Sequence, residues 1–325
     1  MSRPMRRLPA FLDRYTLLLI AVVVIASLLP ARGRFAGDVE LAARAAIVLL
    51  FFLHGAKLPR EAVVAGIAHW RLHLTVLFTT FAAFPLIGLA LGPLATRLFD
   101  PALYGGLLFL CCLPSTVQSS IAFTAMARGN VAAAVVAAST SNLAGILFTP
   151  LLTGLLLARQ GSASLEAVET IVLLLLVPFV AGQIARRWVA GWIARHGWLV
   201  AMVDRGSILL MVYVAFGQAV VQGLWGRVSG GDIAGMLVVS AILLAVALGF
   251  TRAVSRLQGF SRADEITVMM CGSKKSLATG VPMASLLFPA AVAGSIVLPL
   301  MIFHQLQLII CAALARRWGA RQGES

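Results

Sequence analysis

The chain has 325 residues, of which 60% are apolar and only 12% charged, and its mean hydropathy is +0.96. A soluble domain carries about twice that charged fraction, so this composition excludes a water-soluble globular protein and predicts contact with membrane lipid. The formal net charge of +14 does not indicate a nucleic-acid partner, because the basic residues lie in short segments between apolar runs and form no basic-aromatic array.

Long apolar segments recur along the whole chain, and each approaches the roughly 20 residues that an α-helix needs to cross a hydrocarbon core of about 30 Å. In chain order, these segments cover residues 15–30, 39–56, 72–92, 104–127, 131–157, 167–185, 206–226, 233–250, 266–288 and 291–315. We therefore expect an all-α integral membrane protein with about ten transmembrane helices.

The connections between the segments are short, and the longest polar stretch, residues 186–205, divides the chain into two halves. The expected order is a cytoplasmic N-terminus at 1–14, a first five-helix repeat at 15–157, a sixth helix with its preceding loop at 158–185, a cytoplasmic inter-helix loop at 186–205, the remaining helices of the second repeat at 206–315 and a cytoplasmic C-terminus at 316–325. This orientation places most basic residues on the cytoplasmic side, as the positive-inside rule requires. Two five-helix halves would form inverted repeats, an arrangement found in many secondary transporters.

Two polar patches interrupt apolar segments at corresponding positions of the two halves. The first contains Pro114, Ser115, Thr116, Gln118, Ser119 and Ser120, and the second contains Gly272, Ser273, Lys274, Lys275 and Ser276. Pro114 removes a backbone donor and Gly272 permits local unwinding, so we expect helices 4 and 9 to be discontinuous. Each break would leave a half-helix N-terminus suited to an anion, and freed carbonyl groups suited to a small cation. The alternative is a pair of kinked helices held together by hydroxyl groups.

The two lysines lie near the middle of segment 266–288, where a charged side chain costs about 2.5–3.5 kcal/mol even on a lenient insertion scale. All twelve acidic residues can be placed at segment ends or in loops, so no carboxylate within the membrane is expected to neutralise them. Adjacent positions on a helix diverge by about 100 degrees, so Lys274 and Lys275 need not have the same role. One could snorkel or lose its proton, while the other meets an anionic ligand or a group of carbonyls; both could also simply anchor the end of a helix.

Further polar residues interrupt segment 131–157, where Ser139, Thr140 and Asn142 are candidates for ligand contact or for packing against neighbouring helices. The last segment holds His304, Gln305 and Gln307 as additional polar groups. The four cysteines lie inside apolar segments with no zinc-like spacing, so we expect no cofactor and no metal cluster. A membrane-embedded enzyme is disfavoured, because no acid and no pair of histidines is expected at membrane depth.

The stretch from Leu113 to Asn130, LPSTVQSSIAFTAMARGN, and the later stretch from Cys271 to Met283, CGSKKSLATGVPM, resemble the bile acid:sodium symporter family. They are most similar to the branch of sodium/bile acid cotransporter 7 and its bacterial relatives. The resemblance implies a core domain of spans 3–5 and 8–10, in which broken helices 4 and 9 cross. It also implies a panel domain of spans 1, 2, 6 and 7, with substrate bound between the two domains.

Several residues of the family's sodium site are replaced in this sequence. Sodium-coupled members place a glutamate just ahead of the glycine in the ninth helix, with a glutamine and an asparagine shortly after it. The matching positions here are Met270, Lys274 and Lys275, and Ala134 and Ala138 replace expected hydroxyls on helix 5. Because an ammonium group can take the electrostatic role of a bound monovalent cation, we hypothesise that one lysine substitutes for sodium.

The sequence therefore predicts a secondary transporter of a small organic anion that works by alternating access in the cell inner membrane. The coupling ion is left open between sodium and a proton, with sodium-independent transport as the favoured hypothesis, and the protein could be a monomer or a homodimer. The alternative is a membrane regulatory protein that affects calcium homeostasis or envelope assembly without net solute transport.

Overall fold

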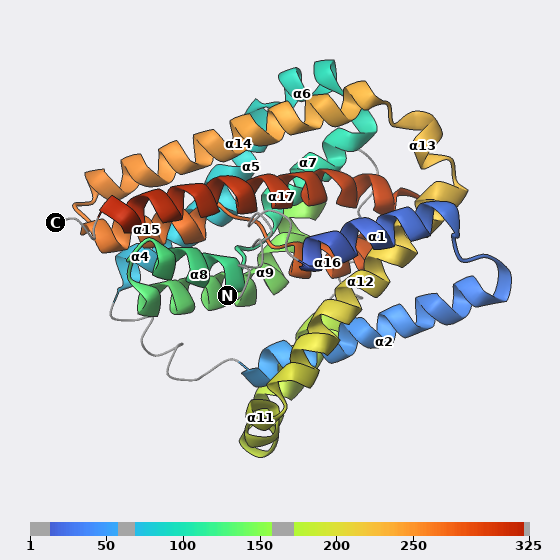
Figure 1. The fold of residues 1–325 in the computed structure, drawn as a ribbon, viewed down its shortest axis with the longest axis horizontal. Helices are drawn as coiled ribbons and strands as arrows, with labels where there is room; N and C mark the ends of the chain where they lie inside the picture. The colour runs from blue at the N-terminus through green and yellow to red at the C-terminus, as the bar shows by residue number, and fades with distance from the viewer. Residues whose placement is uncertain (1–13, 58–68, 158–171, 322–325) are drawn as a thin grey trace, which may run out of the picture.

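A computed structural model describes residues 14–57, 69–157 and 172–321, and every regular element in these ranges is a helix. In chain order the helices are α1 (Arg14–Leu28), α2 (Gly33–Lys57), α4 (Trp70–Phe78), the π-helix η1 (Thr79–Ala83), α5 (Phe84–Ala90), α6 (Gly92–Leu98), α7 (Pro101–Cys112), α8 (Gln118–Met126), α9 (Val131–Leu157), the π-helix η3 (Val172–Leu176), α11 (Val177–Arg195), α12 (Gly197–Val221), α13 (Leu224–Arg227), α14 (Gly230–Leu257), α15 (Arg262–Gly272), α16 (Leu277–Leu287) and α17 (Ala290–Arg321). Figure 1 shows their arrangement.

Seven helical stretches within the described residues are long and apolar enough to cross a membrane. The three other predicted spans correspond to shorter pieces, because α1 has 15 residues and the two spans with polar patches are each divided in two. The segment predicted at 104–127 forms α7 and α8, and the segment predicted at 266–288 forms α15 and α16. The chain is thus a helical, multi-pass membrane protein, while the count of ten crossings stays a prediction.

Helices α1, α2, α11 and α12 pack against one another on one side of the molecule (Figure 1). The contact between α2 and α11 is close because each helix presents a glycine to the other. A Cβ atom on Gly55 would meet the carbonyl oxygen of Phe179, and one on Gly182 would meet that of Phe52. Small residues that let two backbones approach are typical of helix pairs in membranes.

The remaining helices form a second group, in which α17 contacts α7, α8, α14 and α16; α17 also meets α12 from the first group. The buried ends of the two broken helices lie in the middle of this second group (Figure 1). The contact between α12 and α17 is the principal junction between the two groups. These two groups contain the helices that the family resemblance assigned to the panel and the core.

The predicted inter-helix loop at 186–205 is wrong, because these residues are helical. Helix α11 continues to Arg195 and α12 begins at Gly197, with His196 between them. The apolar segments end where polar side chains begin, at residue 186. The helices α11 and α12 nevertheless continue through residues 186–205, with a mixture of polar and apolar side chains on their surfaces. For the same reason α17 runs to Arg321, into the predicted C-terminal tail. Residues 1–13, the loop part 158–171 of the predicted sixth-helix unit and residues 322–325 lie outside the described ranges.

Candidate functional site

The two helix breaks meet in the interior of the protein. Helix α7 ends at Cys112 and α8 begins at Gln118, while α15 ends at Gly272 and α16 begins at Leu277. The backbone amide of Ser276 donates to the carbonyl of Pro114 at 2.9 Å. In the other direction, the hydroxyl of Ser120 donates to the carbonyl of Met270 at 3.0 Å, and the hydroxyl of Ser115 donates to that of Cys271. The predicted breaks in both helices are present, and hydrogen bonds connect them directly.

Helix α9 supports the first break with side chains that replace its missing helical hydrogen bonds. Ser141 Oγ accepts from the amide of Ser115 at 3.0 Å, and Asn142 Nδ2 donates to the Ser115 carbonyl at 2.7 Å. Asn142 also accepts from the hydroxyl of Thr279 on α16 at 2.8 Å, so it contacts both broken helices. Gly145 permits the close approach, since a Cβ atom there would lie 2.7 Å from the Pro114 ring.

Lys275 places its ammonium group in a cage of main-chain carbonyls. Its Nζ donates to the carbonyl oxygens of Thr80 at 2.8 Å, Cys111 at 2.8 Å and Leu113 at 2.7 Å. The Nζ also lies 4.1 Å from the centre of the Phe84 ring, a distance at which a cation is attracted to the π-face. The side chain is fully buried. We call the three oxygens of Thr80, Cys111 and Leu113 the carbonyl cage.

The chain leaves these three carbonyls free for a local reason in each case. In η1 the amide of Phe84 bonds five residues back to Thr79, so the next acceptor, Thr80, would need the amide of residue 85. That residue is Pro85, which has no N–H. Cys111 would normally pair with the amide of Ser115, which is instead bound to α9, and Leu113 lies inside the break. The carbonyl cage is therefore built by one π-helix and one broken helix.

Gln307 on α17 holds the backbone of Lys275 on both sides. Its Oε1 accepts from the Lys275 amide at 2.8 Å, and its Nε2 donates to the Lys275 carbonyl at 2.8 Å. The same Nε2 lies 2.9 Å from Nδ1 of His304. The side-chain amide of Gln307 is fully buried and bonds to both the N–H and the C=O of Lys275, so it fixes the orientation of the Lys275 backbone. Gln307 thus positions Lys275, whose side chain enters the carbonyl cage.

Lys274 points to a different surface of the same break. Its Nζ is fully buried and has no hydrogen-bond partner within the described residues. The nearest aromatic ring is Phe123 of α8, with its centre 4.4 Å from Nζ. The surrounding side chains include a buried apolar cluster to which Met270 and Cys311 belong. Of the two adjacent lysines, one is therefore saturated with acceptors and the other has none.

The remaining predicted site residues fall into three environments. The hydroxyls of Thr116 and Ser119 lie 2.7 Å apart at the start of α8, beside an exposed Gln118. Gly272 packs against Thr251 of α14 and Thr79 of η1. Ser273 Oγ donates back to the Met269 carbonyl, and Ser276 caps α16 by accepting from the amide of Thr279. Ser139 and Thr140 are half-buried on α9, and the contacts to the break come from the following residues instead.

Sequence reasoning did not assign several residues that complete the site: Thr80, Phe84, Phe123, Ser141, Thr279 and Gln307. Ser141 lies within the polar run from Ser139 to Asn142, and Gln307 is a polar residue in an apolar helix, so both carried a visible signal. The carbonyl of Thr80 carried only an indirect signal, the proline five residues later. Within the described residues no group of three or more His, Cys, Asp or Glu side chains could hold a metal ion.

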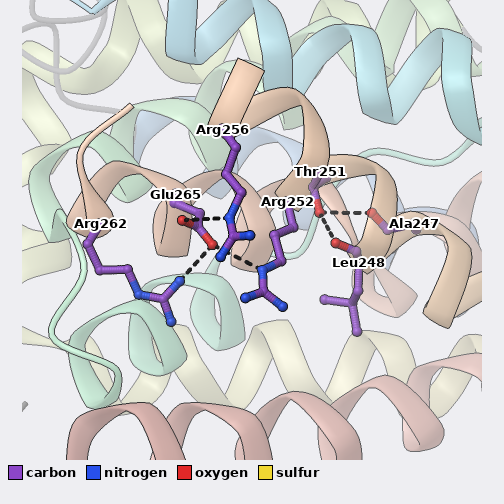
Figure 2. Close-up of polar contacts among 7 residues, drawn as sticks. All are labelled: Ala247, Leu248, Thr251, Arg252, Arg256, Arg262 and Glu265. Atoms are coloured by element: carbon purple, nitrogen blue, oxygen red, sulfur yellow. Dashed lines mark hydrogen bonds and ion pairs between the residues drawn. The ribbon is translucent and has the colours of Figure 1, made fainter. Parts of the chain in front are cut away.

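The outer end of α15 is anchored by a charged cluster (Figure 2). The side chain of Glu265 is 8% exposed, and its carboxylate lies 2.6 Å from Arg262, 3.5 Å from Arg252 and 3.9 Å from Arg256. Two of these arginines are on α14 and one is on α15, so the cluster joins the two helices. Three cations share the Glu265 carboxylate, while the neighbouring carboxylate of Asp264 bonds to Ser261 and Asn130. The three arginines therefore outnumber the two acids at this end of α15.

Two broken helices that meet inside a bundle of long apolar helices are typical of secondary transporters, in which discontinuous helices commonly form the binding site. The chain belongs to the SBF-like CPA transporter family, whose family model matches residues 13–320. This confirms the resemblance to the bile acid:sodium symporters and identifies the protein as a member of a membrane transporter family.

The chain is similar to three named relatives over most of its length. An uncharacterized protein of Pseudomonas aeruginosa is 54% identical over all of this chain and 97% of its own length. YfeH of Escherichia coli K12, whose name marks it as a proposed symporter, is 53% identical over 94% of this chain and 93% of its own length. Sodium/bile acid cotransporter 7 of Rattus norvegicus is 29% identical over 83% of this chain and 80% of its own length.

Proposed function

We propose that the protein is a secondary active transporter of a small organic anion, and that the ammonium of Lys275 takes the place of a bound sodium ion. The observation that carries the proposal is the carbonyl cage. Three main-chain oxygens within 2.8 Å of one charged atom form the kind of oxygen site that a hard monovalent cation prefers. Here the cation is covalently attached to the chain, so it cannot be exchanged with solution. Transport that depends on this site therefore does not need sodium.

An anionic substrate is supported by the charges around the crossing. The N-termini of α8 and α16 both begin at the breaks, where their partial positive charges favour an anion. Two buried lysines add to this field, and none of the ion pairs of the described residues neutralises them. Gln118 is the exposed first residue of α8 and is the proposed first contact for an anion that approaches the crossing.

The proposed mechanism is alternating access, in which the group containing the crossing moves against α1, α2, α11 and α12. In this proposal the protein has ten crossings in two inverted repeats, both termini are in the cytoplasm, and the membrane is the inner membrane of the cell. Because Lys274 Nζ has no acceptor, it is the candidate group for proton coupling. The active unit is a monomer or a homodimer, and no chemical conversion of the substrate is involved.

The test combines ligand-induced thermal stabilisation with flux measurements. Purified protein is screened with small organic anions, with and without sodium and at two pH values, because bound ligands raise the unfolding temperature. Anions that stabilise the protein are then offered as labelled substrates to proteoliposomes that contain it. We expect sodium-independent uptake of at least one stabilising anion. Stabilisation and uptake by none of them would contradict the proposal and favour a regulatory role.

A further inference from the structure

The outer surface between α4 and α14 contains a groove that the crossing does not use. It has a volume of about 280 Å³ and is lined on α4 by Trp70, Arg71, Leu74, Thr75 and Phe78, and on α14 by Val254 and Gln258. From Trp70 to Phe78 the groove follows the nine residues of α4, whose eight steps of 1.5 Å cover about 12 Å. One leaflet of the hydrocarbon core is about 15 Å deep, so the groove covers most of that depth.

The groove is apolar at one end and polar at the other. At the apolar end, the rings of Phe78 and Phe250 lie 6.3 Å apart and close the space between the two helices. Leu74 and Phe78 are 54% and 55% exposed, so their side chains form an open apolar wall. At the polar end, Arg71 donates to the carbonyl of Gln258 at 3.0 Å. The shape and polarity match an amphiphile with its chain toward the membrane centre and its head at the surface.

The polar end carries uncompensated positive charge. The guanidinium of Arg71 lies 5.8 Å from the centre of the Phe260 ring, and no carboxylate pairs with it within the described residues. An arginine has five N–H donors, and the bond to Gln258 uses one of them. The cluster around Glu265 (Figure 2) joins the same helix α14 to α15, and its three arginines outnumber the two acids of the first turn of α15. A phosphate group fits this end by charge and by donor geometry.

Trp70 marks the depth at which this end lies. Its side chain is 60% exposed, and tryptophan is enriched at the level of lipid headgroups. The surrounding arginines belong to the side that the positive-inside rule assigns to the cytoplasm, where anionic lipids are concentrated. We infer that the groove between α4 and α14 is a binding site for an anionic phospholipid, with its phosphate at Arg71 and an acyl chain along Leu74 and Phe78.

This site would be coupled to the crossing through both of its walls. Helix α4 continues directly into η1, whose Thr80 carbonyl accepts from Lys275. On the other wall, α14 presents Thr251 to the second break, where a Cβ atom on Gly272 would lie 3.0 Å from the Thr251 methyl group. A lipid between α4 and α14 therefore braces the two helices that hold the crossing from outside.

The test is lipid binding to purified, delipidated protein in detergent, measured by native mass spectrometry. Phosphatidylglycerol and phosphatidylcholine are compared, because they share acyl chains and differ in net charge. Replacing Arg71 by Gln should weaken phosphatidylglycerol binding about fivefold, the effect of one basic residue near an anionic membrane surface. Arg97→Gln is the matched control, because Arg97 is also exposed but lies on α6, outside the groove. Arg97→Gln should leave the preference for phosphatidylglycerol over phosphatidylcholine unchanged.

A second pair of variants tests the apolar part of the groove without changing charge. Leu74→Trp should fill the groove and reduce binding of both lipids, whereas Leu86→Trp on the exposed face of α5 should have no effect. Equal binding of the two lipids by the unmodified protein, or equal losses in Arg71→Gln and Arg97→Gln, would overturn the inference. Displacement of phosphatidylglycerol by inorganic phosphate alone would also overturn it, because the site would then take a free anion. None of these outcomes depends on transport.

Discussion

Lys274 and Lys275 are neighbours in the chain and are both fully buried, yet their surroundings are opposite. Lys275 enters a cage of three carbonyl oxygens on the side of η1 and α7, while Lys274 faces an aromatic ring and apolar side chains on the side of α8. The difference shows that burial of a charge does not by itself define its role. The acceptors that the neighbouring backbone provides decide whether the charge is part of the framework or is left available.

The largest effect is expected from Lys275→Met, which keeps the length of the side chain and removes the charge. The three carbonyls of the cage would lose their donor in a buried setting, at about 1–3 kcal/mol for each orphaned group. We expect the free energy of unfolding in detergent to fall by about 3 kcal/mol or more. An unfolding free energy equal to that of the unmodified protein would show that the cage does not need the ammonium.

Lys274→Met should change the free energy of unfolding in the opposite direction from Lys275→Met. The substitution removes a buried ammonium that has no hydrogen-bond partner within the described residues, so no acceptor loses its donor. A charged side chain at this depth costs about 2.5–3.5 kcal/mol even on a lenient insertion scale, and we expect the free energy of unfolding to stay the same or to rise by up to that amount. Uptake measured on the same sample reports whether the charge has a separate role in transport. A loss of stability as large as that of Lys275→Met would remove the distinction between the two lysines.

Gln307→Met tests how the direction of Lys275 is fixed. This change removes two hydrogen bonds to the Lys275 backbone, each contributing about 0.5–1.5 kcal/mol, so the expected loss is about 1–3 kcal/mol. Gln307→Glu is the matched control, since it keeps an acceptor for the Lys275 amide and loses the donor to its carbonyl. We expect the glutamate variant to retain sodium-independent behaviour if its fold is intact. Identical stabilities for the methionine variant and the unmodified chain would contradict this role.

The smallest effect is expected from two serines on α9. Ser141→Ala removes the acceptor for the Ser115 amide and should cost about 1–2 kcal/mol in the free energy of unfolding. Ser139→Ala, two residues earlier, should stay within about 0.5 kcal/mol, because its side chain is not part of the support for the break. Thermal unfolding of the two variants under the same conditions compares them. Equal costs would mean that the break does not depend on the contact to Ser141.

The sequence was sufficient to place both breaks, because in each of them a proline or a glycine stands beside a cluster of polar side chains. A proline alone is not enough, since Pro150 and Pro299 lie inside continuous helices. The sequence also identified the lysines as unusual and suggested that one could meet carbonyls. It could not assign that role to Lys275. Every residue has a main-chain carbonyl, so the sequence does not show which carbonyls are free, and the three acceptors lie 162 to 195 positions away in the chain. The loop predicted at 186–205 was wrong because polarity marks the membrane boundary and does not mark the end of a helix.

The central claim, that the Lys275 ammonium stands in for a bound cation, is tested most directly by sodium titration of Lys275→Ala. This variant keeps the three carbonyls of the cage and leaves space beside them. We expect sodium, compared with choline, to raise the unfolding temperature of Lys275→Ala and to leave the unmodified protein unchanged. An unfolding temperature of Lys275→Ala that sodium does not raise above its value in choline would contradict the claim. So would strictly sodium-dependent transport by the unmodified protein, unaltered by alanine at either lysine.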